Sequence, residues 1–161
     1  MGSAAASMAA AYTQRKKDVE SGAAEQARAL IATLEVTTLL QAADDDAVAY
    51  SDLQRTWNKE LEISADEKTA IEARALAIPT TLLEDCHSRI HQIYDFLPHC
   101  NPNITSDAKV GIHQLAGAAR AAYQVSINEK IDCKSCSPFV DVHTFTSRLQ
   151  PFLYMRHANK I

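Results

Sequence analysis

Apolar residues recur at helical spacing through the first half of the chain. No proline and only one glycine, Gly22, lie between Gly2 and Ile78. From residue 23 onward the apolar positions fall three or four apart, which places them on one face of an α-helix. We therefore predict a first helix, a break over residues 14–21, and a long helix over roughly residues 22–61. The apolar stripe of that long helix consists of Ala27, Leu30, Ile31, Leu34, Thr38, Ala42, Ala49, Leu53 and Trp57.

A third helix is predicted to begin at Ser64. Residues 64–67 read Ser-Ala-Asp-Glu, a capping-box pattern in which the hydroxyl of Ser64 and the carboxylate of Glu67 bond to free backbone amides. Pro79 interrupts the helical pattern, because a proline removes one backbone hydrogen bond and crowds the preceding turn. We expect it to kink or restart the helix, and Pro98 to end it.

The second half of the chain predicts two more helices. Thr105 or Ser106 can cap a helix that runs to about Glu129. Its small residues, Gly111, Gly117, Ala118, Ala119, Ala121 and Ala122, predict close packing against another helix. A final amphipathic helix is expected from Pro138. The predicted fold is all-α, with about five helices, some long and kinked, in a single domain over residues 1–161.

Charge and hydropathy exclude two classes of partner. The net charge is −4, and no Lys/Arg cluster offers a surface for a nucleic-acid backbone. No apolar stretch reaches the 18 or so residues that a transmembrane helix needs. The N-terminal residues also lack the basic start of a secretory signal. We therefore expect a cytoplasmic protein with reduced cysteines.

Asp46 is the first residue that departs from its pattern. It lies four residues after Ala42 and three before Ala49, so the pattern places a carboxylate on the apolar face of the long helix. Burying such a charge is costly unless another group pairs with it. Asp46 is therefore a candidate site residue, with a buried hydrogen bond or an intersubunit ion pair as the alternative.

A polar cluster over residues 101–107 is the second candidate. It holds two amides, two hydroxyls and a carboxylate directly before and within a helix start. Backbone amides at such a start favour an anion or a polar ligand. The alternative is a loop with a good helix cap and no ligand.

The cysteines and histidines do not form a complete metal-binding pattern. Cys133 and Cys136 make one CxxC pair, while His87 and His91 are four residues apart on a predicted helix. A structural zinc site needs four ligands, and the spacing of the others is irregular. We expect ordinary thiols, surface histidines and no metal site.

The same residues resemble a known family, the formiminotransferase-cyclodeaminase C-terminal domain and its single-domain relatives. Residues 101–108 (Asn-Pro-Asn-Ile-Thr-Ser-Asp-Ala) resemble the family's Asn-Pro-Asn-Ala-Ile-Ser-Asp-Ala block. Residues 122–128 are similar to its Leu-Asn-Val-Arg-Ile-Asn segment, and residues 46–50 to its Asp-Ala-x-Ala-Phe stretch. Residues 7–17 resemble the end of its first helix and a basic turn. The resemblance covers about residues 2–130.

The resemblance implies an elongated antiparallel helical bundle that forms a homodimer through helix faces and acts on a folate. It implies ring closure of 5-formiminotetrahydrofolate to 5,10-methenyltetrahydrofolate with loss of ammonia, a step of histidine degradation. A tetrahydrofolate derivative is then the substrate, and no cofactor is tightly bound. Whether a formiminotransferase acts as a partner is left open.

The implied chemistry assigns roles to individual residues. Attack by N10 with departure of an amine needs a general base and a general acid, for which Asp46 and Asp107 are the candidates. The polar residues expected to orient the pterin or the reacting amidine are Asn101, Asn103, Ser106 and Asn128. Lys16 or Lys17 can meet the acidic tail of the substrate.

Two alternatives within this family remain open, and a metal-binding helical bundle is a third. Methenyltetrahydrofolate cyclohydrolase activity needs the same acid and base beside the same pterin. A non-catalytic helical dimer of the same family is the other, because family members begin with a glycine-rich loop, and this chain starts at a position partway along their first helix. Gln124 and Ser126 also replace the family's Asn and Arg.

Overall fold

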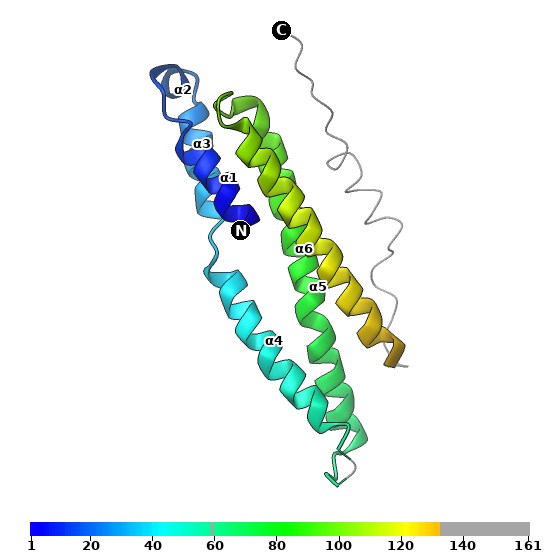
Figure 1. Cartoon of the computed structure of the whole chain (residues 1–161). Coiled ribbons are helices and arrows are strands. Elements are labelled where there is room, and N and C mark those ends of the chain that lie inside the picture. Colours follow the sequence, from blue (N-terminus) through cyan, green and yellow to red (C-terminus); the bar gives the residue numbers. More distant parts are fainter. Residues whose placement is uncertain (59, 133–161) are drawn as a thin grey trace. The chain divides into compact units, whose positions relative to one another are not determined.

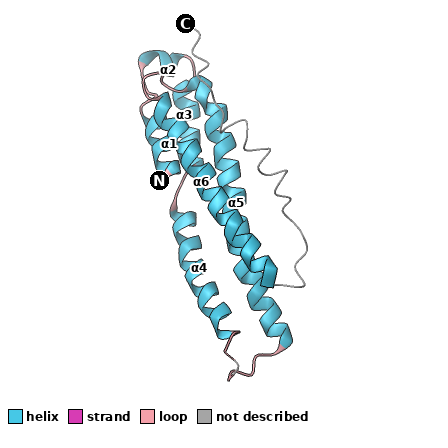
Figure 2. Cartoon of the chain, turned by 45° about the vertical axis from the view of Figure 1, so that its right-hand side comes forward, coloured by secondary structure: helices cyan, strands magenta, loops and turns pink. Residues whose placement is uncertain are grey.

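The computed structural model describes residues 1–58 and 60–132, with side chains through Ser126. Every regular element in these residues is a helix, which confirms the all-α prediction (Figures 1 and 2). In chain order they are α1 (Gly2–Ala11), α2 (Lys16–Glu20), α3 (Ala23–Thr33), α4 (Thr37–Arg55), α5 (Ala65–Phe96), the 3₁₀ turn η1 (Leu97–His99) and α6 (Thr105–Asp132). The predicted helix from Pro138 and the Cys133/Cys136 pair lie outside the described residues.

The prediction of one long helix over residues 22–61 is wrong. The helix ends at Thr33, and α4 begins only at Thr37. The hydroxyl of Thr33 donates a hydrogen bond to the Leu30 carbonyl at 2.9 Å. The next residues include β-branched Val36, Thr37 and Thr38, which are poor helix formers. The apolar stripe is therefore divided between two helices.

Several predictions for the bounds of α5 and α6 are confirmed. The Glu67 amide donates to the Ser64 hydroxyl at 3.2 Å, so the predicted cap is confirmed. Helix α5 ends at Phe96, just before Pro98, as predicted, and α6 begins at Thr105. The predicted cap of α6 by Thr105 or Ser106 is wrong, because both residues lie within the helix and the Thr105 hydroxyl donates to the Asn101 carbonyl. Pro79 lies inside α5, and the helix continues through it, so the predicted restart is wrong. The loss of one backbone hydrogen bond does not end a helix that is strongly favoured on both sides.

The chain divides into two compact units. The first contains Met1–Glu35 and Cys86–Ala118, and the second contains Val36–Asp85 and the part of α6 from Ala119 onward. Helices α5 and α6 each contribute to both units. The prediction of a single domain over residues 1–161 stays a prediction.

Small residues bring α1 close to α6 in the first unit. A Cβ atom added to Gly111 would lie 2.7 Å from the Gly2 carbonyl oxygen, and one added to Gly2 would lie 2.8 Å from the Gly111 carbonyl oxygen. The alanines that surround this contact are almost fully buried: Ala6, Ala9, Ala10, Ala108 and Ala116. The close packing predicted for α6 is therefore confirmed at Gly111. Gly117 is exposed and has no neighbour within 4 Å of an added Cβ.

The second unit has a thin core and an exposed apolar surface. Ala49 is the only buried residue of α4. An ion pair between Asp52 of α4 and Arg74 of α5 joins the two helices. The exposed large apolar residues described in this unit are Val36, Leu40, Val48, Tyr50, Trp57, Leu61 and Val125.

We predict that Gly111→Ala destabilises the protein and that Gly117→Ala does not. The new methyl group at position 111 would overlap a backbone oxygen, which typically costs about 1–3 kcal/mol. At position 117 the methyl group meets open space, and the higher helix propensity of alanine is worth roughly 0.5–1 kcal/mol. Urea unfolding followed by far-UV circular dichroism measures both. Equal stabilities for the two variants would contradict the packing described for α1 and α6.

Candidate functional site

The segment between η1 and α6 is held against the end of α1 by Asn101. Its side-chain Nδ2 donates to the Tyr12 carbonyl at 3.1 Å, and its backbone amide donates to the Thr13 hydroxyl at 3.1 Å. Thr13 in turn donates to the Ala9 carbonyl at 3.0 Å, and it is fully buried. We call this set of contacts among Tyr12, Thr13 and Asn101 the junction.

Asn101 also shapes its own loop. Its Oδ1 accepts a hydrogen bond from the Asn103 amide at 3.1 Å, and its carbonyl accepts one from the Thr105 hydroxyl at 3.0 Å. An asparagine that bonds to the amide two residues ahead is a standard way to fix a turn. Asn101 is 8% exposed. Its contacts make it a residue that positions the loop, a role that the sequence did not reveal.

An ion pair fixes the short helix α2 beside the junction. Arg15 Nε and Nη2 donate to the two carboxylate oxygens of Asp18, each at 2.7 Å, and the Arg15 amide donates to Asp18 at 2.9 Å. These bonds hold the pKa of Asp18 below its usual range and raise the pKa of Arg15. Burial raises the pKa of the nearby Cys100 thiol, which also bonds to Thr105 and Thr13. The buried Cys100 Sγ also donates to the Asn101 carbonyl at 3.7 Å.

The predicted lysines lie on α2. Both side chains are exposed, and Lys16 Nζ lies 4.0 Å from Glu20 Oε1. Figure 1 shows α2 at the same end of the first unit as the turn between α5 and α6. Two exposed cations therefore lie at the same end of the first unit as the polar loop.

Three predicted residues around the start of α6 are accessible. Asn103 and Ser106 are exposed, and Asp107 is half-buried in the first turn of α6. An ionised carboxylate is favoured there by the helix macrodipole. These three side chains and the lysines of α2 all belong to the first unit.

The remaining two predicted residues are not placed with this group. Asp46 belongs to the second unit and is exposed, so its predicted burial on an apolar face is wrong. The reason is that the predicted long helix is broken, and α4 buries only Ala49. Asn128 lies on α6, outside the residues whose side chains are described, so its predicted role stays a prediction.

Sequence reasoning missed four polar residues that build this region. Arg15 and Asp18 carry a capping-box spacing that could have been found, since an acidic residue three positions after the N-cap is its signal. Arg89 is buried and approaches the Ser3 hydroxyl at 3.4 Å, joining α5 to α1. A contact between residues so far apart in the chain has no local sequence signal.

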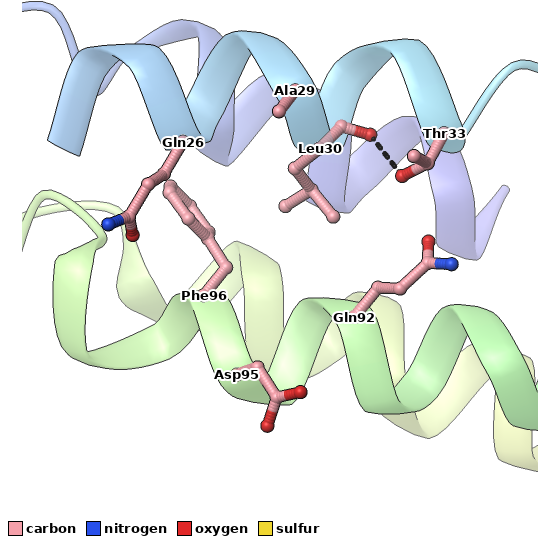
Figure 3. A pocket seen from close by; sticks show the side chains of 7 residues that line it. All are labelled: Gln26, Ala29, Leu30, Thr33, Gln92, Asp95 and Phe96. Atoms are coloured by element: carbon pink, nitrogen blue, oxygen red, sulfur yellow. Dashed lines mark hydrogen bonds between the residues drawn. The ribbon is translucent and has the colours of Figure 1, made fainter. Parts of the chain in front are cut away.

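A groove of about 350 Å³ lies between α3 and the last part of α5, within the first unit (Figure 3). It is lined by Gln26, Ala29, Leu30, Thr33, Gln92, Asp95 and Phe96. Phe96 and Leu30 point into the groove from opposite helices, while Asp95 points away from α3. The Gln92 Oε1 atom is buried and accepts no hydrogen bond from any described residue. None of the predicted site residues lines this groove.

The described residues contain neither a metal-binding cluster of side chains nor a membrane-spanning helix. Within residues 1–58 and 60–132 there is no group of three or more His, Cys, Asp or Glu side chains arranged to hold a metal ion. No helix in that part of the chain has the length and hydropathy to cross a membrane.

The family model for formiminotransferase-cyclodeaminase matches residues 1–132. The match includes the whole of the junction, α2 and α6. The chain belongs to the formiminotransferase-cyclodeaminase family. This confirms the resemblance carried by the Asn-Pro-Asn block. The sequence of this cyclodeaminase-family chain matches no curated protein.

A solved structure has a similar fold. The crystal structure of formiminotetrahydrofolate cyclodeaminase from Thermotoga maritima aligns with a TM-score of 0.57 and 22% sequence identity, covering 95% of this chain and 72% of that one. The helical architecture of this family member is thereby supported independently of its sequence motifs.

We predict that Thr13→Val opens the junction and that Thr13→Ser preserves it. Valine fills the same space but leaves the buried Asn101 amide without its acceptor, a loss of about 1–3 kcal/mol. Serine keeps the hydroxyl and loses only a methyl group, about 0.8 kcal/mol. Amide hydrogen exchange distinguishes the two: the Asn101 amide should be protected in the wild type and in Thr13→Ser, and exchange faster in Thr13→Val. Equal protection in all three proteins would show that this hydrogen bond does not hold the loop.

Proposed function

We propose that the chain is a folate-dependent one-carbon enzyme. It closes 5-formiminotetrahydrofolate to 5,10-methenyltetrahydrofolate and releases ammonia. The observation that supports this proposal is the junction, because it bonds the loop before Asn103, Ser106 and Asp107 to the end of α1 in a cyclodeaminase-family chain. The lysines of α2 belong to the same unit.

The reaction needs two proton transfers and no redox partner. N10 attacks the formimino carbon, and its proton passes to a general base. A general acid then gives a proton to the departing nitrogen, the bond from carbon to that nitrogen breaks, and ammonia leaves. A positioned carboxylate typically contributes about 10²–10⁴-fold to such a step.

Asp107 is the better placed of the two proposed acid–base groups. It is half-buried at the start of α6, next to the exposed Ser106. A carboxylate there also favours the positive charge that develops as the methenyl product forms. Asp46 remains the second proposed group, although its exposure on α4 gives it no contact that supports the role.

Binding of the folate follows from the remaining side chains. Asn103 and Ser106 offer hydrogen bonds to the pterin or the reacting amidine, and Asn101 holds their loop in place. Lys16 and Lys17 attract the carboxylates of the substrate's glutamate tail. Because both lysines are exposed, this attraction should weaken with added salt.

We also propose an oligomeric state, a cellular location and a metabolic role for the chain. The exposed apolar residues of α4, with Tyr50 and Trp57 in edge contact at 6.3 Å between ring centroids, support a homodimer. A cytoplasmic location, a place in histidine degradation and the absence of a tightly bound cofactor complete the proposal. Cyclohydrolase activity is the second candidate, because a water in place of the amine uses the same acid and base.

We predict that the full chain converts 5-formiminotetrahydrofolate to the methenyl product and that Asp107→Asn lowers kcat by about 10²–10⁴-fold. Asp44→Asn is the matched control, since Asp44 is exposed on α4 and has no proposed role. Absorbance of the methenyl chromophore reports turnover, and Asp46→Asn run in parallel tests the second carboxylate.

The outcomes separate the candidates. If the wild type is active and Asp44→Asn lowers kcat as much as Asp107→Asn does, the proposed role of Asp107 is wrong. Hydrolysis of supplied methenyltetrahydrofolate without any ring closure would favour the cyclohydrolase. A folded dimer that performs neither reaction would leave the non-catalytic alternative.

A further inference from the structure

Two histidines on α5 lie close enough to share a ligand. His87 and His91 are one helical turn apart, and their Nε2 atoms lie 3.2 Å from each other. The ring centroids are 4.5 Å apart, with 70° between the ring planes. Both belong to the part of α5 in the first unit, away from the junction residues. The spacing of two histidines in a sequence is common, but this convergence of their Nε2 atoms is a property of the fold.

The distance between the two nitrogens suits a transition-metal ion. Zinc binds imidazole nitrogen at about 2.0–2.1 Å and prefers a tetrahedral arrangement. An ion at that distance from two nitrogens 3.2 Å apart subtends an angle of roughly 100–105°. This angle is near the tetrahedral value, so the separation of the two nitrogens suits a shared ion. Each ring must then carry its proton on Nδ1 and present the Nε2 lone pair.

The residues and solvent around the two histidines determine which ions the pair can bind. His91 is exposed and His87 is half-buried, so a hydrated ion can reach the pair from solvent. No third His, Cys, Asp or Glu completes the set among the described residues. Water fills whichever positions no protein ligand occupies. Two imidazoles favour zinc, nickel or copper, whereas magnesium and calcium require oxygen ligands.

We propose that His87 and His91 form a two-histidine binding site for a divalent transition-metal ion, of which zinc is the probe. The ion links two successive turns of α5 and so stabilises this helix. Neither histidine is among the residues proposed to bind the substrate, so this proposal does not rest on the folate chemistry.

Zinc titration of the full, untagged chain tests the proposal. Every sample carries Cys133→Ser and Cys136→Ser, so that the CxxC pair does not compete for the metal. The wild-type background should bind one zinc ion by calorimetry, at least tenfold more tightly than His87→Gln or His91→Gln. His113→Gln is the matched control, because His113 is exposed on α6, and it should bind as the wild type does.

The change in Tm on adding zinc is a second measurement, which applies even if a variant is less stable than the wild type. Zinc should raise the Tm of the wild type and of His113→Gln, because a ligand that binds only the folded state stabilises it. It should leave the Tm of both α5 variants unchanged. Binding of equal strength in all four proteins, or no binding to any of them, would overturn the proposal, whatever the outcome of the folate assays.

Discussion

The hydrogen bond between the Asn101 amide and the Thr13 hydroxyl joins residues 88 positions apart in the chain. The described site depends on it. The bond is buried, and the Thr13 hydroxyl is both its acceptor and the donor to the end of α1. A buried polar network of this kind is stable only when every member has a partner. Asn101 meets that requirement by bonding to Tyr12, Thr13, Asn103 and Thr105.

Small side chains make this junction possible. Gly2 and Gly111 let the backbones of α1 and α6 approach each other, and alanines fill the rest of the contact. Such a core has little volume per residue, so it tolerates few added atoms. Close approach of α1 aligns its end with the loop before α6. The packing of α1 against α6 and the hydrogen bonds of the junction therefore both hold the end of α1 against the loop before α6.

The sequence predicted the helical class, the cap at Ser64, the end of α5 near Pro98 and the start of α6, because each has a local signal. It did not predict the break after Thr33, since the apolar period continues across residues 34–38 and masks their poor helix propensity. For the same reason Asp46 was expected on a buried stripe and is exposed. The resemblance identified the Asn-Pro-Asn block, but not that Asn101 bonds back to α1. That contact, like Arg89 with Ser3, depends on tertiary packing and has no pattern in the chain.

The most direct test of this account is an NMR titration of the full chain with 5-formyltetrahydrofolate, a stable reduced folate. The account predicts that the backbone amides of residues 12–18 and 101–108 shift together along one saturable curve, because the junction joins these segments into one site. Thr13→Val should weaken that response, and Thr13→Ser should retain it. Shifts confined to α4, or none at all in a folded protein, would contradict the claim that the junction builds the folate site.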